Sequence, residues 1–183
     1  LRALEDYDYP RDLTPEQISE LSGVRFEKDE TGAIVPVPLG GSYDPQTKTF
    51  TFYTTRFSLY SVVQVKDLVK LELTIGNQVS KVNGTDQNID VPPTIINNRT
   101  MVPLRFIGEA LGAEFVWDGK TRTVTFSLDG KELKVVIDQL SPGMDVPATI
   151  VGNRTIVPIR YISEAFGAEV TWFPTERKVT VVK

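Results

Sequence analysis

The sequence contains neither cysteine nor histidine among its 183 residues. Without these residue types, the usual tetrahedral zinc sites, histidine-ligated copper sites and haem sites lose their common ligands. Serine–histidine–aspartate and cysteine–histidine catalytic arrangements are excluded as well. No disulfide bond can stabilise the fold. The chemistry that remains is that of carboxylates, of a serine–lysine pair, or of calcium or magnesium held by oxygen ligands.

Two further features are missing: a positive net charge and a long apolar run. The chain has 20 Lys and Arg against 24 Asp and Glu, which gives a net charge of −4. Binding to nucleic-acid phosphates needs a basic face, so we expect no nucleic-acid partner. No apolar stretch approaches the roughly 20 residues that span a bilayer. The chain begins at Leu1 without a signal peptide, so we expect a mature fragment or a piece of a longer protein.

One stretch of the sequence occurs twice. Residues 94–126 read TIINNRTMVPLRFIGEALGAEFVWDGKTRTVTF, and residues 149–181 repeat the pattern about 55 positions later as TIVGNRTIVPIRYISEAFGAEVTWFPTERKVTV. Extended back to Asp90 and Asp145, roughly 21 of 37 aligned positions are identical, which indicates an internal repeat. The repeat defines the architecture more clearly than it defines an activity.

Each copy predicts a tight hairpin, a short helix and a second hairpin. In the first copy, Asn97 and Asn98 tolerate the positive φ angles that a two-residue turn requires. Pro103 suits the first helical position, and Gly112 suits the left-handed residue that ends a helix. The equivalents in the second copy are Gly152, Asn153, Pro158 and Gly167. The predicted buried helix faces are Leu104, Ile107, Gly108 and Leu111, and Ile159, Ile162, Ser163 and Phe166.

The first third of the chain predicts a small, mostly-β domain with a short leading helix. Thr14, Pro15 and Gln17 form an N-cap and capping-box pattern that predicts a helix over residues 15–21. Short extended runs between Asp-Pro and Gly turns follow up to residue 65 and favour an antiparallel sheet or a piece of a sandwich. The pattern SYDPQTKTFTFYTTRFSLYSVVQV resembles the closing strands of β-sandwich modules beside S-layer-type domains of bacterial surface proteins. Residues 66–70 form the candidate linker.

Both copies closely resemble the copper amine oxidase N-terminal-like domain, a repeat of bacterial cell-surface proteins. The resemblance covers about residues 71–183. It is carried by Asn-Arg-Thr, Val-Pro-(Leu/Ile)-Arg, Glu-Ala-(Leu/Phe)-Gly-Ala and Trp in the same order in each copy, beginning at Asn98 and Asn153. It implies a non-catalytic stalk module. In amine oxidases the copper and the oxidised tyrosine cofactor belong to a separate catalytic domain, so we expect no cofactor and no copper here.

From these patterns we predict an α+β fold, in which an antiparallel meander sheet packs with helices as two β-hairpin–helix repeats, behind a small mostly-β domain. The predicted domains are residues 1–66, possibly truncated, and 67–183, with repeats at about 71–128 and 129–183. The resemblance implies a unit that begins and ends with a helix, which residues 103–166 would supply. The strands left over at the two ends would then complete each other. We therefore expect residues 71–75 and 179–182 to be neighbours.

Several residues have two readings. We expect Trp117 and Trp172 to lie in the core, because period-2 alternation places Trp117 on the same face as Phe115; the alternative is a platform on which sugars stack. Arg105 with Glu109, and Arg160 with Glu164, are spaced four apart. We expect helical ion pairs, and the alternative is a general acid with its charge partner.

Two surface regions remain. Residues 86–90 alternate oxygen-bearing side chains as a calcium loop does, but the Gly and Glu of an EF-hand are missing, so we expect a solvated strand edge. Phe173 and Pro174 replace Asp118 and Gly119 at the second hairpin tip, which favours a contact there. A weak interaction surface is predicted from Phe173, Pro174, Tyr43 and Tyr53, although the tyrosines, which include Tyr7, Tyr9 and Tyr60, show no regular spacing.

For function, we expect no enzyme and no catalytic, cofactor-binding or metal-binding residues. The leading hypothesis is a structural or interaction module (stalk, spacer or adhesion unit) of a secreted or cell-surface bacterial protein. Its partners would be other domains of the same protein or cell-wall components. One alternative is a module that binds carbohydrate or cell-wall polysaccharide. A less favoured alternative is a glycoside hydrolase with two carboxylates, which requires a cleft holding both acids.

Overall fold

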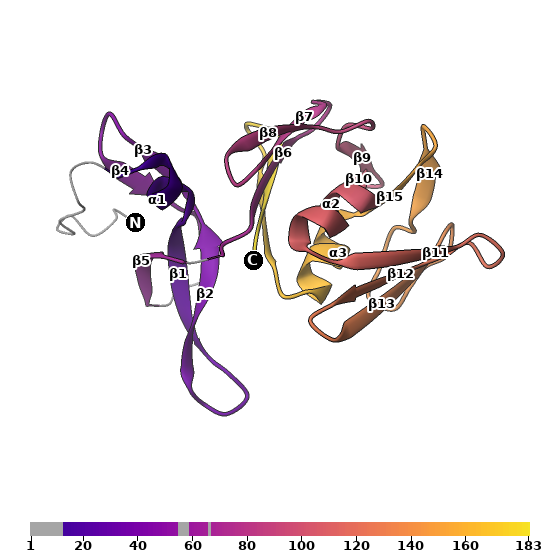
Figure 1. Cartoon of the computed structure of the whole chain (residues 1–183), viewed down its shortest axis with the longest axis horizontal. Helices are drawn as coiled ribbons and strands as arrows, with labels where there is room; N and C mark the ends of the chain where they lie inside the picture. The colour runs from indigo at the N-terminus through magenta and orange to yellow at the C-terminus, as the bar shows by residue number, and fades with distance from the viewer. Residues whose placement is uncertain (1–12, 55–58, 66) are drawn as a thin grey trace. The chain divides into compact units, whose positions relative to one another are not determined.

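A computed structural model describes residues 13–54, 59–65 and 67–183 (Figure 1). The chain divides into two compact units, Leu1–Leu68 with Val182, and Val69–Val181 with Lys183. We call them unit 1 and unit 2 and describe each by itself. Tyr7 and Tyr9 lie outside the described residues.

The leading helix of unit 1 begins as its capping residues predict. Helix α1 spans Pro15–Ser19, with Thr14 as its N-cap. The Gln17 backbone N–H donates to the Thr14 hydroxyl over 3.2 Å, and the Thr14 N–H donates to the Gln17 side-chain oxygen over 2.9 Å. The predicted capping box is therefore confirmed. The helix ends two residues before the predicted position 21, because Leu21 already belongs to the first strand.

The rest of unit 1 is antiparallel. Strands β1 (Leu21–Lys28), β2 (Ile34–Gly40) and β5 (Tyr60–Gln64) form a sheet in the order β2-β1-β5. Strands β3 (Ser42–Asp44) and β4 (Thr49–Thr51) form a separate hairpin. The Asp29 carboxylate accepts hydrogen bonds from the backbone N–H groups of Thr31 and Ala33, which fixes the turn between β1 and β2.

Unit 2 contains both repeats and three sheets. A five-stranded sheet runs in the order β16-β17-β6-β7-β8, a four-stranded sheet in the order β14-β15-β10-β9, and a three-stranded sheet in the order β11-β12-β13. The strands are β6 (Lys70–Thr74), β7 (Val79–Val82), β8 (Thr85–Asn88), β9 (Thr94–Ile96), β10 (Arg99–Pro103), β11 (Glu114–Asp118), β12 (Thr123–Leu128), β13 (Lys131–Val136), β14 (Thr149–Val151), β15 (Arg154–Pro158), β16 (Glu169–Phe173) and β17 (Lys178–Val182). The helices are α2 (Leu104–Leu111) and α3 (Ile159–Ala165).

The local signals of the repeats are confirmed. Asn97 and Asn98 adopt φ angles of 47° and 63°, and Gly152 and Asn153 adopt 53° and 62°. These left-handed pairs close the hairpins β9–β10 and β14–β15. Gly112 ends α2 in the left-handed region. The prolines stand one position earlier than predicted, as N-caps rather than as first helical residues.

The two ends of unit 2 lie side by side. Strand β6 is hydrogen-bonded next to β17, which confirms that the first and last strands are neighbours (Figure 1). The Val69 N–H donates to the Lys183 carbonyl over 2.8 Å, and the Lys183 N–H donates back over 2.9 Å. Further along, the Ile75 N–H donates to the Arg177 carbonyl over 2.9 Å. The continuous hairpin β12–β13 makes the equivalent bond, from Ile137 to the Arg122 carbonyl, over 3.0 Å. The paired ends therefore reproduce an interior hairpin of the other repeat.

The two copies meet through antiparallel pairing of β10 with β15. In this pairing Met101 lies opposite Pro158, Val102 opposite Val157, and Pro103 opposite Ile156. Because Val102 and Val157 are equivalent positions of the repeat, this register relates the copies by an approximate two-fold axis that passes between them. One sheet thus holds both hairpins, and each repeat buries the inner strand of the other.

The core is common to both copies. Buried side chains of α2, α3, β10, β15 and the flanking sheets form one cluster, with Val102, Ile107, Val157 and Ile162 fully enclosed. Phe126 of the first copy packs against Phe166 of the second, with ring centroids 6.4 Å apart and planes tilted by 58°. A smaller cluster contains Met101, Ile156, Val91 and Val146, two residues from each copy. Neither repeat encloses a core of its own.

The predicted α+β fold is wrong, because the described residues are mostly β. Strands account for 49% of them and helices for 12%. The helices have only five, eight and seven residues, since each repeat helix is confined between an N-capping proline and a C-terminal glycine nine positions later. Such short helices cannot cover a sheet. The expected single meander is instead divided into several antiparallel sheets that pack around the helices.

The shared core predicts that unit 2 unfolds in one cooperative step. Replacing the fully buried Phe126 by Ala leaves a cavity against Phe166, and we expect it to lower the free energy of unfolding by roughly 3–5 kcal/mol. Urea denaturation followed by circular dichroism measures the change. The control is Val116→Ala, which changes a side chain that is 70% exposed and should alter stability by less than about 0.5 kcal/mol. Two separated transitions for the two repeats would contradict the shared core.

Candidate functional site

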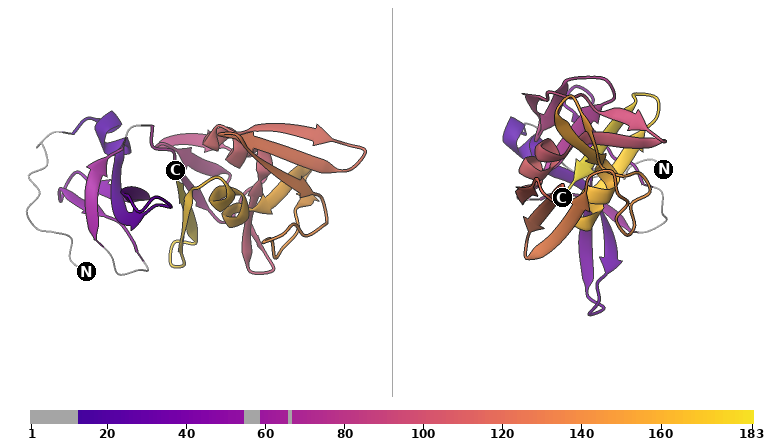
Figure 2. Two further views of the ribbon diagram at one scale, coloured as in Figure 1. Left: turned by 90° about the horizontal axis from the view of Figure 1, so that it is seen from below. Right: turned by 90° about the vertical axis from the view of Figure 1, so that its right-hand side faces the viewer.

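Both tryptophans are exposed, so the prediction that they lie in the core is wrong. Trp117 is 49% exposed and Trp172 is 37% exposed. Each lies near the end of a strand at a sheet edge, β11 and β16 respectively. The hairpin β11–β12 extends beyond α2 (Figures 1 and 2). Trp117 lies opposite the buried Val124, but on the outer strand of its sheet. Period-2 alternation predicts on which face of a strand a side chain lies, but not whether neighbouring elements cover that side chain.

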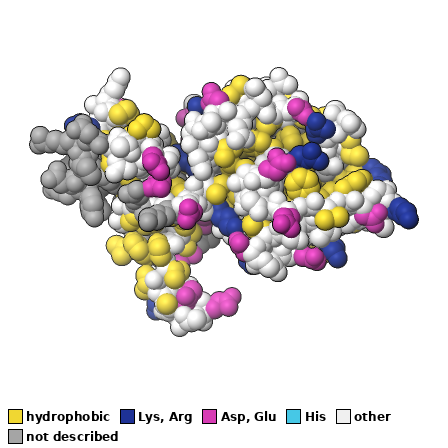
Figure 3. Space-filling model, in the orientation of Figure 1, with side chains coloured by type: hydrophobic (Ala, Val, Ile, Leu, Met, Phe, Trp, Pro, Cys, Tyr) yellow, Lys and Arg dark blue, Asp and Glu magenta, His cyan; other side chains and the backbone are white. Residues whose placement is uncertain are grey.

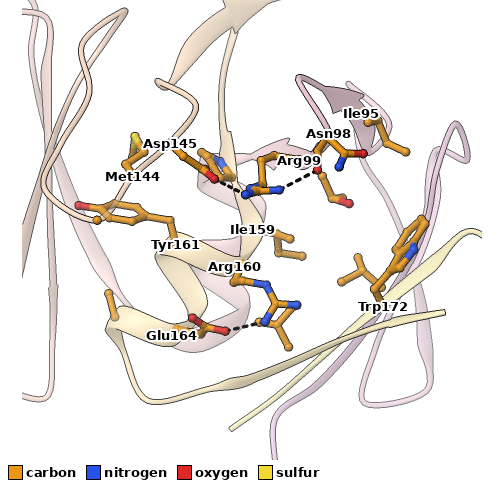
Figure 4. Close-up of a pocket in the computed structure, with 16 residues that line it drawn as sticks. Ile95, Asn98, Arg99, Met144, Asp145, Ile159, Arg160, Tyr161, Glu164 and Trp172 are labelled. Atoms are coloured by element: carbon orange, nitrogen blue, oxygen red, sulfur yellow. Dashed lines mark hydrogen bonds and ion pairs between the residues drawn. The ribbon is translucent and has the colours of Figure 1, made fainter. Parts of the chain in front are cut away.

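Trp172 borders a groove of about 980 Å³ in unit 2. The walls come from both repeats: α3, β16 and β17 of the second, and the hairpin β9–β10 of the first. Figure 4 shows Trp172 at one end of the groove and Tyr161 at the other, with the side chains of Arg99 and Arg160 between them in this view. Ile95 of the hairpin is 42% exposed and adds an apolar patch to the wall.

The charged groups in the groove are paired with one another. The Arg160 guanidinium donates to the Glu164 carboxylate over 2.9 Å, which confirms one of the two predicted helical ion pairs. Arg99 donates to the Asp145 carboxylate and, over 3.2 Å, to the Asn98 carbonyl. Two cations and two carboxylates therefore line the groove without net charge. All four side chains are exposed, so the pairs orient hydrogen-bonding groups more than they stabilise the fold.

The pair of Arg99 with Asp145 joins the two copies, and it has a counterpart. Arg154 donates to the Asp90 carboxylate, over 2.8 Å from its Nε. The approximate two-fold axis exchanges these two ion pairs. These two ion pairs were not predicted from the sequence, although it contains a signal for them: in each copy an Asp stands nine residues before the Arg.

The first repeat differs at the position equivalent to Val170, a residue that lines the groove. There the Arg105 guanidinium lies over the Phe115 ring, 5.4 Å from its centroid. In the second repeat Val170 replaces Phe115, and Arg160 pairs with Glu164 instead. The predicted pairing of Arg105 with Glu109 is thus replaced by a cation–π contact. Val170 is smaller than Phe115 and is among the residues that line the groove.

The residues of the weakly predicted interaction surface lie apart from this groove. Phe173 ends β16, is half-buried, and has the Lys178 ammonium 5.2 Å from its ring centroid. Pro174 is exposed at the following turn. Tyr43 pairs with Phe50 across β3 and β4, and Tyr53 is 57% exposed. The tyrosines belong to unit 1 and the other two residues to unit 2, so a common surface stays a prediction.

The described part of the chain does not fit a copper site. It contains no group of three Asp or Glu side chains that could hold a metal ion, and the sequence has neither His nor Cys. Residues 85–88 form the edge strand β8, which is fully exposed, and Asp86 pairs with Lys81 over 2.8 Å. The predicted solvated strand edge is therefore confirmed for residues 86–88 only, because Ile89 is buried and Asp90 lies beyond the strand. Within residues 13–54, 59–65 and 67–183, no helix is long and apolar enough to cross a membrane.

A titration of the groove tests its ion pairing. The hydrogen bond from Arg99 holds the pKa of Asp145 below its usual value. A carboxylate with a lowered pKa contributes stability above its unfolded-state pKa of about 3.9 and loses it as the pH falls through the folded-state pKa. We expect Arg99→Met to raise the midpoint of Asp145 towards about 3.9, measured by carboxyl NMR. An unchanged midpoint would show that the pair does not form in solution.

A second titration tests the metal prediction. Because the usual copper ligands are absent from the sequence, we expect calorimetry with Cu²⁺ to show no stoichiometric binding tighter than about 1 mM. Tight binding at one ion per chain would mean that oxygen ligands alone build a site.

Comparison with known proteins identifies the repeats. The family model of the copper amine oxidase N-terminal domain matches residues 42–126 and, overlapping, residues 81–181. No curated protein and no solved structure matches the chain. The matched residues make up most of the chain, and they agree with the motifs shared by the two copies. The resemblance seen in the sequence is therefore confirmed: the chain belongs to the copper amine oxidase N-terminal domain family, a non-catalytic domain.

Proposed function

We propose that this chain is a non-catalytic interaction module, an adhesion unit of a secreted or cell-surface bacterial protein. Its partners are cell-wall components or other domains of the same protein. The family membership of both repeats supports the absence of catalysis, and the resemblance of residues 42–65 to modules of bacterial surface proteins supports the location. The observation that carries the choice of adhesion over spacing is the position of the two ends of unit 2.

Those ends are hydrogen-bonded to each other. Val69 and Lys183 pair through both of their N–H groups over 2.8 and 2.9 Å. A spacer gains reach when its two ends lie at opposite poles. Unit 2 spans almost no distance between its own ends, so it contributes little length to a stalk. What it presents instead is a compact body with a groove that both repeats build.

The groove argues against a hydrolase. Glycosidases need one carboxyl group with a raised pKa as the general acid. Here Arg99 lowers the pKa of Asp145, and Arg160 binds the carboxylate of Glu164. The Asp145 carboxylate is therefore held in the charged form, which cannot donate a proton. The exposed Trp172 in the same groove favours binding of a ligand over catalysis.

Cell-wall binding tests the proposal. We expect the purified, labelled chain to sediment with cell walls from a Gram-positive bacterium. The binding should saturate, and an excess of unlabelled chain should compete with it. The measurement is the bound fraction against protein concentration, with serum albumin as the control for non-specific retention. Binding that never saturates, or that equals the retention of albumin, would reject an adhesion role.

A further inference from the structure

We propose that the groove between α3 and the hairpin β9–β10 is a binding site for an uncharged glycan chain. The site includes Trp172, Tyr161 and the ion pairs of Arg160 with Glu164 and of Arg99 with Asp145. This inference rests on the proposed adhesion function and names its ligand class and its place in the fold. Four features support it: the aromatic surface, the charge balance, the dimensions of the groove and the difference between the repeats.

The aromatic surface is suited to a sugar ring. A pyranose has an apolar face of C–H groups and a rim of hydroxyls, so it binds where a flat aromatic ring adjoins hydrogen-bonding groups. Trp172 leaves 37% of its surface uncovered at the groove. Figure 4 places the Arg160–Glu164 pair and the Arg99–Asp145 pair in the same groove. Contact of an indole with water is unfavourable, because its large surface is mostly apolar. A ligand that covers the ring removes this unfavourable contact.

The charge balance selects a neutral ligand. The lining contains Arg99, Arg160, Asp145 and Glu164, so its formal charge is zero. Each guanidinium already donates to a carboxylate. Because both cations are already paired, the groove offers an anionic ligand no net positive charge. A hydroxyl can instead donate to a carboxylate oxygen and accept from a spare guanidinium N–H without breaking either pair. Figure 3 shows the same mixture of both charge signs around hydrophobic side chains on the visible face of unit 2.

The dimensions favour a chain over a single sugar. At about 980 Å³, the groove lies at the upper end of the roughly 300–1,000 Å³ that small-molecule sites occupy. Its walls are strands and a helix with a hairpin opposite, so the aromatic groups at its two ends can contact different rings of one oligosaccharide. The site is present only when both repeats are folded together.

The repeats differ in a way that predicts one site per chain. The first repeat carries Phe115 at the position of Val170, with the Arg105 guanidinium over its ring. Because Phe is larger than Val, we expect less room beside the tryptophan of the first repeat. Trp117 is equivalent to Trp172 and is also exposed. It therefore provides a matched control: the same residue type at the same point of the repeat, but outside the residues that line the groove.

The experiment uses the whole chain and two neutral probes, cellotetraose and chitotetraose. Calorimetry measures the affinity, and the indole N–H signals of the two tryptophans report which one is contacted in an NMR titration. We expect one site per chain and a shift confined to Trp172. Trp172→Ala should weaken binding about tenfold or more, and Trp117→Ala should leave the affinity within about twofold, because only one indole contacts sugar.

A third variant changes Val170, which lines the groove. Val170→Phe copies the residue of the first repeat, so we expect it to weaken binding about tenfold while both tryptophans remain. Circular dichroism verifies the fold of each variant, and the NMR titration of the unmodified chain needs no variant.

Three outcomes would overturn the proposal: neither neutral tetrasaccharide binds, the Trp117 signal moves instead, or an anionic polygalacturonate binds more tightly than the neutral probes. If one of these outcomes occurs and the chain still sediments with cell walls, only the glycan site is rejected. If the chain does not sediment with cell walls either, the adhesion function is rejected as well.

Discussion

The antiparallel pairing of β10 with β15 is the interaction on which unit 2 depends. It sets Val102 against Val157 at equivalent positions of the repeat, and the two-fold relationship follows from that register. Each copy then supplies what the other lacks: Phe126 of one packs on Phe166 of the other, and Arg99 of one pairs with Asp145 of the other. A shift of one residue in this pairing would turn Val102 away from the helices and exchange the two buried faces of the strand, which pack into different clusters.

Local chemistry made part of the fold predictable from the sequence. Asn97-Asn98 and Gly152-Asn153 closed the hairpins, and Gly112 ended its helix, because each requires a backbone conformation that few residues accept. The pairing of β6 with β17 could be inferred from the phase of the repeat. The number of sheets could not, because alternation in a strand does not specify its partner. The exposure of Trp172 was missed for a related reason, since burial depends on how far the neighbouring elements extend.

The candidate site was harder to predict from the sequence than the fold was. Its parts are Trp172 and α3 from one copy and a hairpin some 70 residues earlier from the other. No single motif contains them. The repeat carried only an indirect signal. The copies differ at Phe115 and Val170, and Val170 lines the groove, but they also differ at core positions such as Leu111 and Phe166.

Duplication explains how such a site can arise without loss of stability. In a two-fold pair, each position of one copy has an equivalent in the other, and the two positions can carry different residues. Arg105 and Phe115 keep a cation–π contact in the first copy, while Arg160 is released to pair with Glu164 in the second. The exposed ion pairs that join the copies contribute little free energy, so the hydrophobic core provides the stability and the surface of one copy is free to change. Since the groove uses walls from both copies, binding and folding of the two repeats are linked: a ligand held there stabilises the paired state of the repeats over either one alone.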